Sequence, residues 1–466
     1  MRKFLSILCM LSFPALLLAQ QPDEAVPIDF QAAGREALEH LKALIRLDTS
    51  NPPGNEAQVT AYLAGQLRQA GLEPQLFEPE PGRGSLVVRY KGTGEKRPLL
   101  IMSHIDVVPV VEKEWSVPPF AGVVKDGYLW GRGTLDDKSM AAAELQVMLL
   151  LARNRVRLSR DLIFLAEADE EAGGRLGIKW LLANHPDLLD VEMALNEGGR
   201  VVWKNGKMRY VAIQTTEKIY QDFEVIARGE SGHSSVPTGG NPVALLIRAL
   251  ERIGSMKFPV ELNPVTREFF TQLAPIFPRG LSLCASRLEN PEEGAQCAEL
   301  LSVNPNYNAM LRTTCTPTIL KAGIKENVIP SEARANLNCR LLPGTDLDKF
   351  ARQLRKVIDD DQVELRFARE PEPRPGPSPV DSPLFQTIRS VIEAMAPGVP
   401  VVPYMSAGGT DSQVLRKRGV LAYGLLPFPI QEEEIRTMHA NNERIRVDSF
   451  IWGTELLYRI VVEAAK

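Results

Sequence analysis

The chain has 466 residues and a formal net charge of -4, and 44% of its residues are hydrophobic while 24% are charged. This apolar content is enough to bury a core, so the composition excludes a disordered chain, a collagen-like fibre and a small disulfide-dense scaffold. The length exceeds that of one typical domain and suits two. Because there is no basic excess to neutralise phosphates, the composition also argues against a nucleic-acid partner.

The first 19 residues have the pattern of a secretory signal peptide. Arg2 and Lys3 precede an apolar stretch over residues 4–18, and two glutamines follow Ala19. A basic start, a short apolar stretch and a small residue are typical of an export signal. The alternative is a membrane-anchoring helix, which the shortness of the apolar stretch opposes. We therefore predict a periplasmic or secreted protein with no stable membrane span after cleavage of residues 1–19.

Export would permit disulfides, because the compartments outside the cytoplasm are oxidising. Removal of the signal peptide takes Cys9 away and leaves Cys284, Cys297, Cys315 and Cys339. Sequence alone leaves their pairing open. Cys284 and Cys297 flank a short segment, so we predict a local disulfide between them, and a small buried residue at Cys339. The absence of a Cys-x-x-Cys pattern argues against a cysteine-based zinc site.

Helical and strand patterns alternate in the first half of the chain. The apolar spacing predicts helices over residues 37–47, 57–69, 138–152 and 177–183. Short apolar runs predict strands over residues 86–88, 99–102, 162–165 and 193–195. Strands that alternate with helices indicate an α/β layer with a largely parallel sheet.

The pattern changes near residue 217. We expect strands over residues 220–227 and 333–341 and helices over 242–253 and 346–358, with a loop-rich stretch between the two halves. The proline-rich run over residues 370–379 cannot continue a helix or a central strand. We interpret it as the exit from a second domain that is inserted into the first. The first pattern then resumes, with a helix over residues 383–395 and a strand over 421–424.

Candidate functional side chains stand where predicted strands end. His104 and Asp106 follow an apolar strand, and their spacing of two puts both on one face if the strand continues. The carboxyl ends of strands are where open α/β sheets build their sites. Asp106 could orient the ring of His104 as a metal ligand. The alternative for this pair is an ordinary surface contact.

Acidic motifs recur after the later strands. They comprise Gly131–Lys138, Glu167–Gly174, Asn196–Gly199 and Met438–Glu443. Clustered acids repel one another unless a cation or a shared proton compensates. Each motif alone could be a helix cap or a solvated loop. Their recurrence, with a histidine at each extreme of the set, favours a polynuclear metal site, and no Gly-x-Ser-x-Gly, His-Glu-x-x-His or P-loop signature competes with it.

Six motifs in register resemble the M20 family of metallopeptidases. They are Ser103–Asp106, Gly131–Lys138, Asp169–Glu171, Asn196–Gly199, Gly232–Ser235 and His439–Glu443. The resemblance implies an α/β fold, with a two-zinc exopeptidase-type catalytic domain around a mostly parallel central sheet and an inserted α+β lid that dimerises. The catalytic domain would comprise residues 28–216 and 373–466, and the lid domain residues 217–372.

The resemblance also implies a set of metal ligands. They are His104, Asp136 and Glu197 for one ion, and Asp136, Glu171 and His439 for the other. The peptide bond between Asp136 and Asp137 would be cis, as in the family. Many relatives have an aspartate where this chain has Asn196, which leaves Glu197 as the ligand of that motif. Two divalent cations are expected, Zn²⁺ by family preference with Co²⁺ or Mn²⁺ as alternatives.

Catalytic roles follow from the same resemblance. Glu170 would take a proton from a metal-activated water and pass it to the departing amine, with Asp106 behind His104. His233 would reach from the lid of a partner subunit and donate to the oxyanion, so a homodimer is expected. The implied substrate contacts are Asn327, Arg340, Gly409 and Thr410. A guanidinium such as Arg340 can bind both oxygens of a carboxylate; the alternative is a rim arginine paired with a nearby acid.

Within the family, Gly409–Asp411 and His439–Glu443 look most like the branch of carboxypeptidase S and the secreted N-fatty-acyl amino-acid hydrolases. This implies hydrolysis of an amide next to a free carboxylate, in a small peptide or an N-acyl amino acid. The alternatives are a dipeptidase of the same family and a non-catalytic binding module on this fold. The complete set of ligands, together with Glu170, argues against the binding module.

Overall fold

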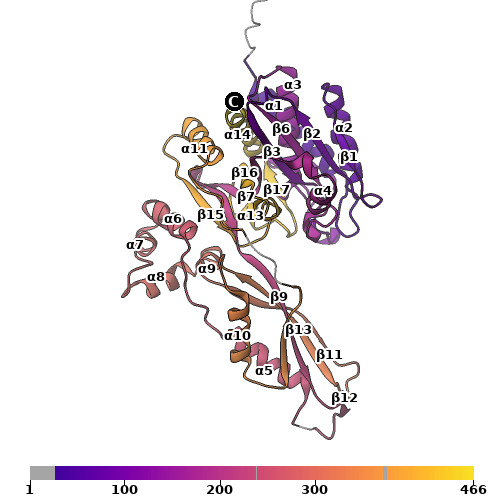
Figure 1. Ribbon diagram of the computed structural model, residues 1–466, viewed down its shortest axis with the longest axis vertical. Helices are drawn as coiled ribbons and strands as arrows, with labels where there is room; N and C mark the ends of the chain where they lie inside the picture. Colours follow the sequence, from indigo (N-terminus) through magenta and orange to yellow (C-terminus); the bar gives the residue numbers. More distant parts are fainter. Residues whose placement is uncertain (1–26, 238, 371–374) are drawn as a thin grey trace, which may run out of the picture.

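The computed structural model describes residues 27–237, 239–370 and 375–466 (Figure 1). The predicted signal peptide over residues 1–19 and part of the proline-rich run lie outside the described residues. The described chain forms an upper body around a large sheet and a narrower lower body around a small sheet. Within these ranges, none of the helices combines the length and the apolarity that crossing a bilayer requires.

The upper body is built on a mixed eight-stranded sheet, which we call the main sheet. Its strands, in spatial order, are β1 (Gln75–Phe77), β2 (Ser85–Tyr90), β6 (Arg160–Glu167), β3 (Lys96–His104), β7 (Met193–Lys204), β16 (Leu421–Ile430), β8 (Lys207–Glu217) and β15 (Val401–Ser406). The four strands at the centre, β6, β3, β7 and β16, are parallel to one another. The antiparallel pairs are β1–β2, β2–β6, β16–β8 and the β7–β8 hairpin. The predicted α/β class with a mostly parallel sheet is therefore confirmed.

Helices cover both faces of the main sheet. They are α1 (Phe30–Ile45), α2 (Ala57–Gln69), α3 (Lys138–Arg153), α4 (Ile178–Asn184), α11 (Pro383–Met395), α12 (Ser412–Arg416), α13 (Glu432–Ile435) and α14 (Val447–Ala465). Side chains of β3 alternate between the two cores, because successive residues of a strand face opposite sides. Leu99 and Ile101 pack in the core of α1, α3 and α14, whereas Leu100 and Met102 pack in the core of α4. The described residues also form the short 3-10 turns η1 (Glu112–Glu114), η2 (Glu170–Ala172), η3 (Pro186–Leu189) and η4 (Ala274–Ile276).

The lower body contains a four-stranded antiparallel sheet, which we call the lid sheet. Its strands, in spatial order, are β11 (Thr314–Ala322), β13 (Glu332–Leu341), β9 (Ile219–Arg228) and β14 (Val363–Phe367). Two helices, α5 (Pro242–Gly254) and α10 (Leu347–Ile358), pack on one face of it around Phe223 and Phe350. At the far end, β10 (Gly232–His233) pairs with β12 (Val328–Ile329) to form what we call the tip.

The stretch expected to be loop-rich is mostly regular, so that prediction is wrong. It contains α6 (Pro264–Leu273), α7 (Arg279–Ser286), α8 (Gly294–Leu301), α9 (Pro305–Leu311) and the strand β11. Asn-Pro pairs suggest turns in a sequence, but Asn263 and Asn304 cap α6 and α9, and the proline that follows each occupies the first helical position. These helices pack against Tyr404 and Met405 of β15, at the edge of the main sheet, although they fall within residues 217–372.

The predicted disulfide between Cys284 and Cys297 is also wrong, whereas Cys339 is buried as expected but takes part in a disulfide. The disulfide joins Cys315 to Cys339, which are directly opposite each other on β11 and β13. Cys284 and Cys297 are free, buried thiols on α7 and α8. The pairing depends on the register between two strands that are far apart in the sequence, and residue spacing does not reveal that register.

The chain first passes from the main sheet to the lid sheet through a single residue. Lys218 lies between β8, which ends at Glu217, and β9, which begins at Ile219. Its ammonium is fully buried and donates to the carbonyl oxygen of Arg312 at 2.8 Å and to Oγ1 of Thr314 at 3.1 Å. Lys218 therefore fixes the segment that leads into β11.

Candidate active site

The candidate site forms where parallel strands of the main sheet end. His104 is the last residue of β3, and it pairs in register with Glu167, the last residue of β6. The turn η2, which carries Glu170 and Glu171, follows β6 directly, and Glu197 lies in β7. Because the carboxyl ends of parallel strands meet at one edge of a sheet, residues far apart in sequence converge here.

Three of the predicted ligands offer atoms that could hold one cation. The ligand atoms of His104, Asp136 and Glu171 all lie within 4.8 Å of one another. Asp136 lies between two imidazoles: Oδ1 is 2.9 Å from Nε2 of His104, and Oδ2 is 2.9 Å from Nε2 of His439. Nε2 of His439 is also 3.1 Å from Oε1 of Glu171. A carboxylate whose two oxygens face two different histidines is arranged as a bridging ligand.

The charges of this cluster depend on one another. Burial opposes ionisation of Asp136, but hydrogen bonds from His104 and His439 hold its pKa well below the usual range. Hydrogen bonds to Asp136 and Glu171 raise the pKa of His439 to about 10. Imidazole nitrogens and carboxylate oxygens are the donors that first-row divalent metals prefer, and such metals bind in place of protons. The residues present therefore fit a divalent metal centre.

Two further carboxyl groups face this cluster. Burial and the charge of Asp136 raise the pKa of Glu197 to about 8. Burial also raises the pKa of Glu170 well above its usual value, and the carboxyl groups of Asp411 and Glu197 raise it further. Carboxylates gathered in one buried place repel one another, and a bound cation would relieve that repulsion.

A glycine permits the close packing around Glu197. A Cβ atom at Gly199 would lie 2.1 Å from the carbonyl oxygen of Gly424 and 2.4 Å from that of Ala212. Strands β7, β16 and β8 therefore approach one another too closely here for any side chain. The Gly198–Gly199 pair has this structural reason to follow Glu197.

Asp106 supports both the histidine and the acidic turn. It is fully buried, and it accepts the backbone N–H groups of Glu170 and Glu171 at 3.2 Å each and the side-chain amide of Asn51 at 2.8 Å. Nδ1 of His104 lies 3.0 Å from the carbonyl oxygen of Asp106. An N–H at Nδ1 can donate to this oxygen, which leaves Nε2 of His104 available for a metal.

Glu443 is a supporting residue to which the sequence analysis gave no role. Its buried carboxylate accepts the N–H groups of Gly133 at 3.2 Å, Leu135 at 2.7 Å and Asp136 at 3.2 Å. It also pairs with Arg132 at 2.5 Å. It therefore fixes the backbone that carries the bridging aspartate. The signal for Glu443 in the sequence was its place at the end of the motif His439–Glu443. It lies immediately before the strand β17 (Arg444–Arg446). This strand pairs with β5 (Tyr128–Trp130), which in turn pairs with β4 (Val123–Lys125).

Arg83 and Asp169 are a second support that sequence reasoning missed. Arg83 donates to Glu56 at 2.8 Å and to Asp169 at 2.8 Å, and all three are buried. Asp169 has a left-handed backbone with φ of 76° and accepts the N–H of Leu176 at 2.9 Å. These contacts hold the start of the turn that carries Glu170. Arg83 stands in a glycine-flanked turn, so no periodic pattern marks it in the sequence.

Two predicted site residues lie far from this centre within one chain. His233 is exposed on β10, and Asn327 immediately precedes β12, so both belong to the tip at the far end of the lower body, away from the main sheet (Figure 1). Nδ1 of His233 accepts from Ser235. Oδ1 of Asn327 is buried and has no hydrogen-bond partner among the described residues. One chain therefore does not bring these two residues to its own metal ligands.

The remaining predicted substrate contacts lie near the junction of the two bodies. Arg340, near the end of β13, stacks 4.6 Å above the ring of Tyr220 and donates from Nε to Asn338 at 3.3 Å. Gly409 is exposed in the loop that follows β15. Thr410 is buried and hydrogen-bonded to Glu217. The peptide bond between Asp136 and Asp137 is cis.

Comparisons with known proteins agree on one family. Residues 100–463 match the family described as Peptidase family M20/M25/M40. The chain is 31% identical over 378 residues to N-fatty-acyl-amino acid synthase/hydrolase PM20D1 of Homo sapiens, covering 79% of this chain and 74% of that protein. It is 28% identical over 394 residues to probable carboxypeptidase S-like 2 of Dictyostelium discoideum, covering 82% and 75%. Its fold matches the M20 family metallo-carboxypeptidase Sso-CP2 from Sulfolobus solfataricus with a TM-score of 0.70 at 20% identity, covering 92% of this chain and 99% of that one.

The role of Glu443 predicts the effect of removing its charge. In Glu443→Gln, an amide replaces the carboxylate that accepts three backbone N–H groups and pairs with Arg132, so the Asp136 backbone should lose its fixed position. We expect metal affinity to fall by about 10- to 100-fold, as for other supports of metal ligands. Titration of the chelator-stripped protein with Zn²⁺ measures this. The control is Glu434→Gln, which alters a buried glutamate that caps α13. Unchanged affinity in Glu443→Gln, or an equal loss in the control, would contradict the role.

Proposed function

This chain belongs to peptidase family M20/M25/M40, and we propose that it hydrolyses the amide bond next to a free carboxylate in N-acyl amino acids or small peptides. The family and the relatives make it a metal-dependent amide or peptide hydrolase. The observation that carries the proposal is the Asp136 carboxylate between two histidines, with the half-buried Glu170 in the same cluster. The binding-module alternative is not favoured, because the family and the named relatives are hydrolases and peptidases.

The choice of substrate rests on the relatives and on Arg340. The names of the relatives refer to N-fatty-acyl amino acids and to a carboxypeptidase. In both kinds of substrate, the bond that is cut lies next to an amino acid with a free carboxylate. Arg340 stacks on Tyr220, a contact that holds its guanidinium while it binds a carboxylate. We therefore assign Arg340 to the substrate carboxylate, and Gly409 and Thr410 to the backbone around it. A dipeptidase remains the near alternative.

The residues of the site divide the chemistry between them. Two divalent cations, which we propose to be Zn²⁺, would be held by His104, Asp136, Glu171, Glu197 and His439, and would supply an activated water and a polarised carbonyl. Glu170 is placed to accept the proton of that water and to deliver it to the departing amine nitrogen. Desolvation raises the pKa of Glu170, which makes its carboxylate a stronger proton acceptor. Asp106 keeps Glu170 in place through the backbone N–H of the turn.

The test is a substrate screen with a blocked-carboxylate control. The zinc-loaded protein should release the amino acid from N-acyl amino acids or dipeptides, and it should not act on the same compounds with an amidated carboxylate. Chelation should abolish release and Zn²⁺ should restore it.

Glu170→Gln should lower kcat by about 100-fold or more while metal content stays unchanged, because the variant loses a proton acceptor but keeps every metal ligand. Glu112→Gln alters an exposed glutamate and serves as the control. Equal hydrolysis of the amidated compounds would contradict the proposal.

We also propose that the protein is a homodimer that pairs through its lid sheets. Strand β11 is the edge of that sheet, and its side chains from Thr316 to Ala322 are exposed. Ile319 and Leu320 are 53% and 65% exposed. A long exposed edge strand with apolar side chains is a ready surface for pairing with another copy. In such a dimer, His233 at the tip would contribute to the active site of the partner subunit. This would explain why His233 lies far from the metal ligands of its own chain.

Complementation between two inactive variants tests this arrangement. His233→Ala and Glu170→Gln should each abolish activity alone. When the two are unfolded together and refolded, mixed dimers should contain one site with both residues intact, and about a quarter of wild-type activity should return. Mixing Glu170→Gln with the double variant Glu170→Gln/His233→Ala is the control and should restore nothing. No recovery in mixed dimers confirmed by mass spectrometry would refute action of His233 in the partner's site.

Export of the protein is the third proposal. The signal-like residues 1–19 support it, and so does the disulfide between Cys315 and Cys339, because disulfides persist in oxidising compartments. N-terminal sequencing of the expressed protein should show a chain that begins after Ala19. A chain that retains residues 1–19 in the cytoplasmic fraction would contradict export.

A further inference from the structure

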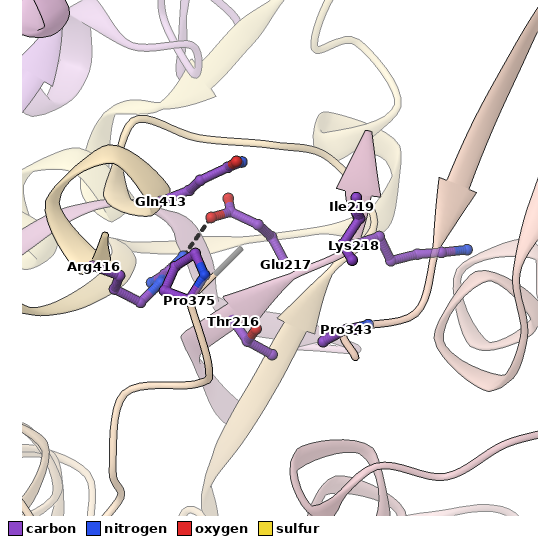
Figure 2. Close-up of a pocket in the computed structure, with 8 residues that line it drawn as sticks. All are labelled: Thr216, Glu217, Lys218, Ile219, Pro343, Pro375, Gln413 and Arg416. Carbon is purple, nitrogen blue, oxygen red and sulfur yellow. Dashed lines mark hydrogen bonds and ion pairs between the residues drawn. The ribbon is translucent and has the colours of Figure 1, made fainter. Parts of the chain in front are cut away.

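Glu217 is the last residue of the main sheet before the chain enters the lid sheet. It ends β8, and Lys218 follows it as the single residue before β9. Figure 2 shows their side chains pointing in opposite directions, with the Glu217 carboxylate between Gln413 and Arg416. The Glu217 side chain is 5% exposed. Burying a carboxylate costs free energy unless hydrogen bonds or ion pairs compensate for the lost solvation, and the contacts of Glu217 provide this compensation.

The carboxylate of Glu217 joins three segments. Oε2 accepts the backbone N–H of Thr410 at 2.7 Å and its hydroxyl at 3.1 Å. Oε1 forms an ion pair with Arg416, the last residue of α12, whose side chain is also buried (Figure 2). Arg416 in turn donates to the carbonyl oxygen of Ala422 in β16 at 3.0 Å. The end of β8, the loop after β15 and α12 are therefore held together through one side chain.

The loop after β15 is hydrogen-bonded at both of its ends to Glu217 and Lys218, where β8 leads into β9. The N–H of Lys218 donates to the carbonyl oxygen of Ser406 at 2.9 Å, and Glu217 holds Thr410. Between the two attachments lie Gly408 and Gly409, which are both exposed. Glycines have little conformational preference of their own, so the shape of this loop is set by its two attachments.

We propose that Glu217 is a positioning residue that holds the loop Gly408–Asp411 in the shape that binds substrate. The proposal rests on the proposed function, which assigns Gly409 and Thr410 to the substrate. Glu217 acts through Thr410, and the metal ligands are held by other residues, among them Asp106 and Glu443. Loss of the Glu217 carboxylate should therefore weaken substrate binding and leave the chemical step largely intact.

Removal of the Glu217 carboxylate would leave two of its partners, Arg416 and Thr410, without this acceptor. Without the carboxylate, Arg416 keeps a buried charge with no acid opposite it, and the N–H of Thr410 loses its acceptor. The loop would then occupy several conformations, and substrate would have to order it on binding. A loss that acts before the chemical step raises KM and changes kcat little.

The experiment compares Glu217→Ala and Glu217→Gln with a matched control in the zinc-loaded full chain. The control is Glu192→Gln, which removes the charge from another ion pair of a buried arginine, Arg160, at 2.6 Å. That pair involves the first residue of β6, at the opposite end of the strand from the candidate site. The measurements are kcat, KM and the hydrogen exchange rate of the backbone amides over residues 406–416.

In Glu217→Ala, we expect KM to rise about 10-fold or more, kcat to stay within about threefold, and the Thr410 amide to exchange faster. Glu217→Gln should show the same changes to a smaller extent, because its amide oxygen can still accept the Thr410 N–H. If Glu217→Ala fails to fold, the KM and exchange rate of Glu217→Gln still test whether Glu217 holds the loop. The control should change neither KM nor the exchange of the loop.

Two results would overturn the proposal. Exchange of the Thr410 amide that stays at the wild-type rate would show that Glu217 does not hold the loop. Faster exchange with an unchanged KM would show that the loop does not position substrate. A wild-type protein that hydrolyses none of the screened compounds would contradict the proposed function instead, and the exchange rates would still decide whether Glu217 anchors the loop.

Discussion

The contact on which the site depends is the carboxylate of Asp136 between the imidazoles of His104 and His439. It joins residues from opposite ends of the chain and places both within reach of one acid. The carboxyl groups of Glu170 and Glu197 lie in the same region, and desolvation and neighbouring carboxylates raise the pKa of both. Bound protons or divalent cations can offset the repulsion among these carboxyl groups, which couples metal binding to the protonation of the site.

The ligands of the site could be predicted because each stands in a local pattern. His104 follows an apolar strand, and the acids near Glu171 and Glu197 follow two others, so a parallel sheet brings them to one edge. The fold class follows from the same alternation of strands and helices. Helices α2 and α11 begin and end where the apolar spacing predicts, because burial on one face sets that spacing.

The supports of the site could not be predicted in the same way. Glu443 and Arg83 act through hydrogen bonds to segments far along the chain, and such contacts leave no periodic trace in the sequence. The pairing of Cys315 with Cys339 depends in the same way on strand register. The helices from α6 to α9 were not predicted. Helices α6 and α9 begin at Asn-Pro pairs, which are also common in turns, and these short helices are stabilised by packing against β15.

The insertion of the lid sheet between β8 and β15 separates two kinds of residue along the gene. All the candidate metal ligands and Glu170 come from segments outside residues 219–341, whereas His233, Asn327 and Arg340 come from inside that range. Changes at Asn327 and Arg340, inside the insertion, can therefore alter substrate contacts during evolution while the metal ligands and Glu170 are inherited unchanged. Lys218, the single residue between β8 and β9, marks one boundary of this insertion, at which recombination between relatives could exchange the lid sheet.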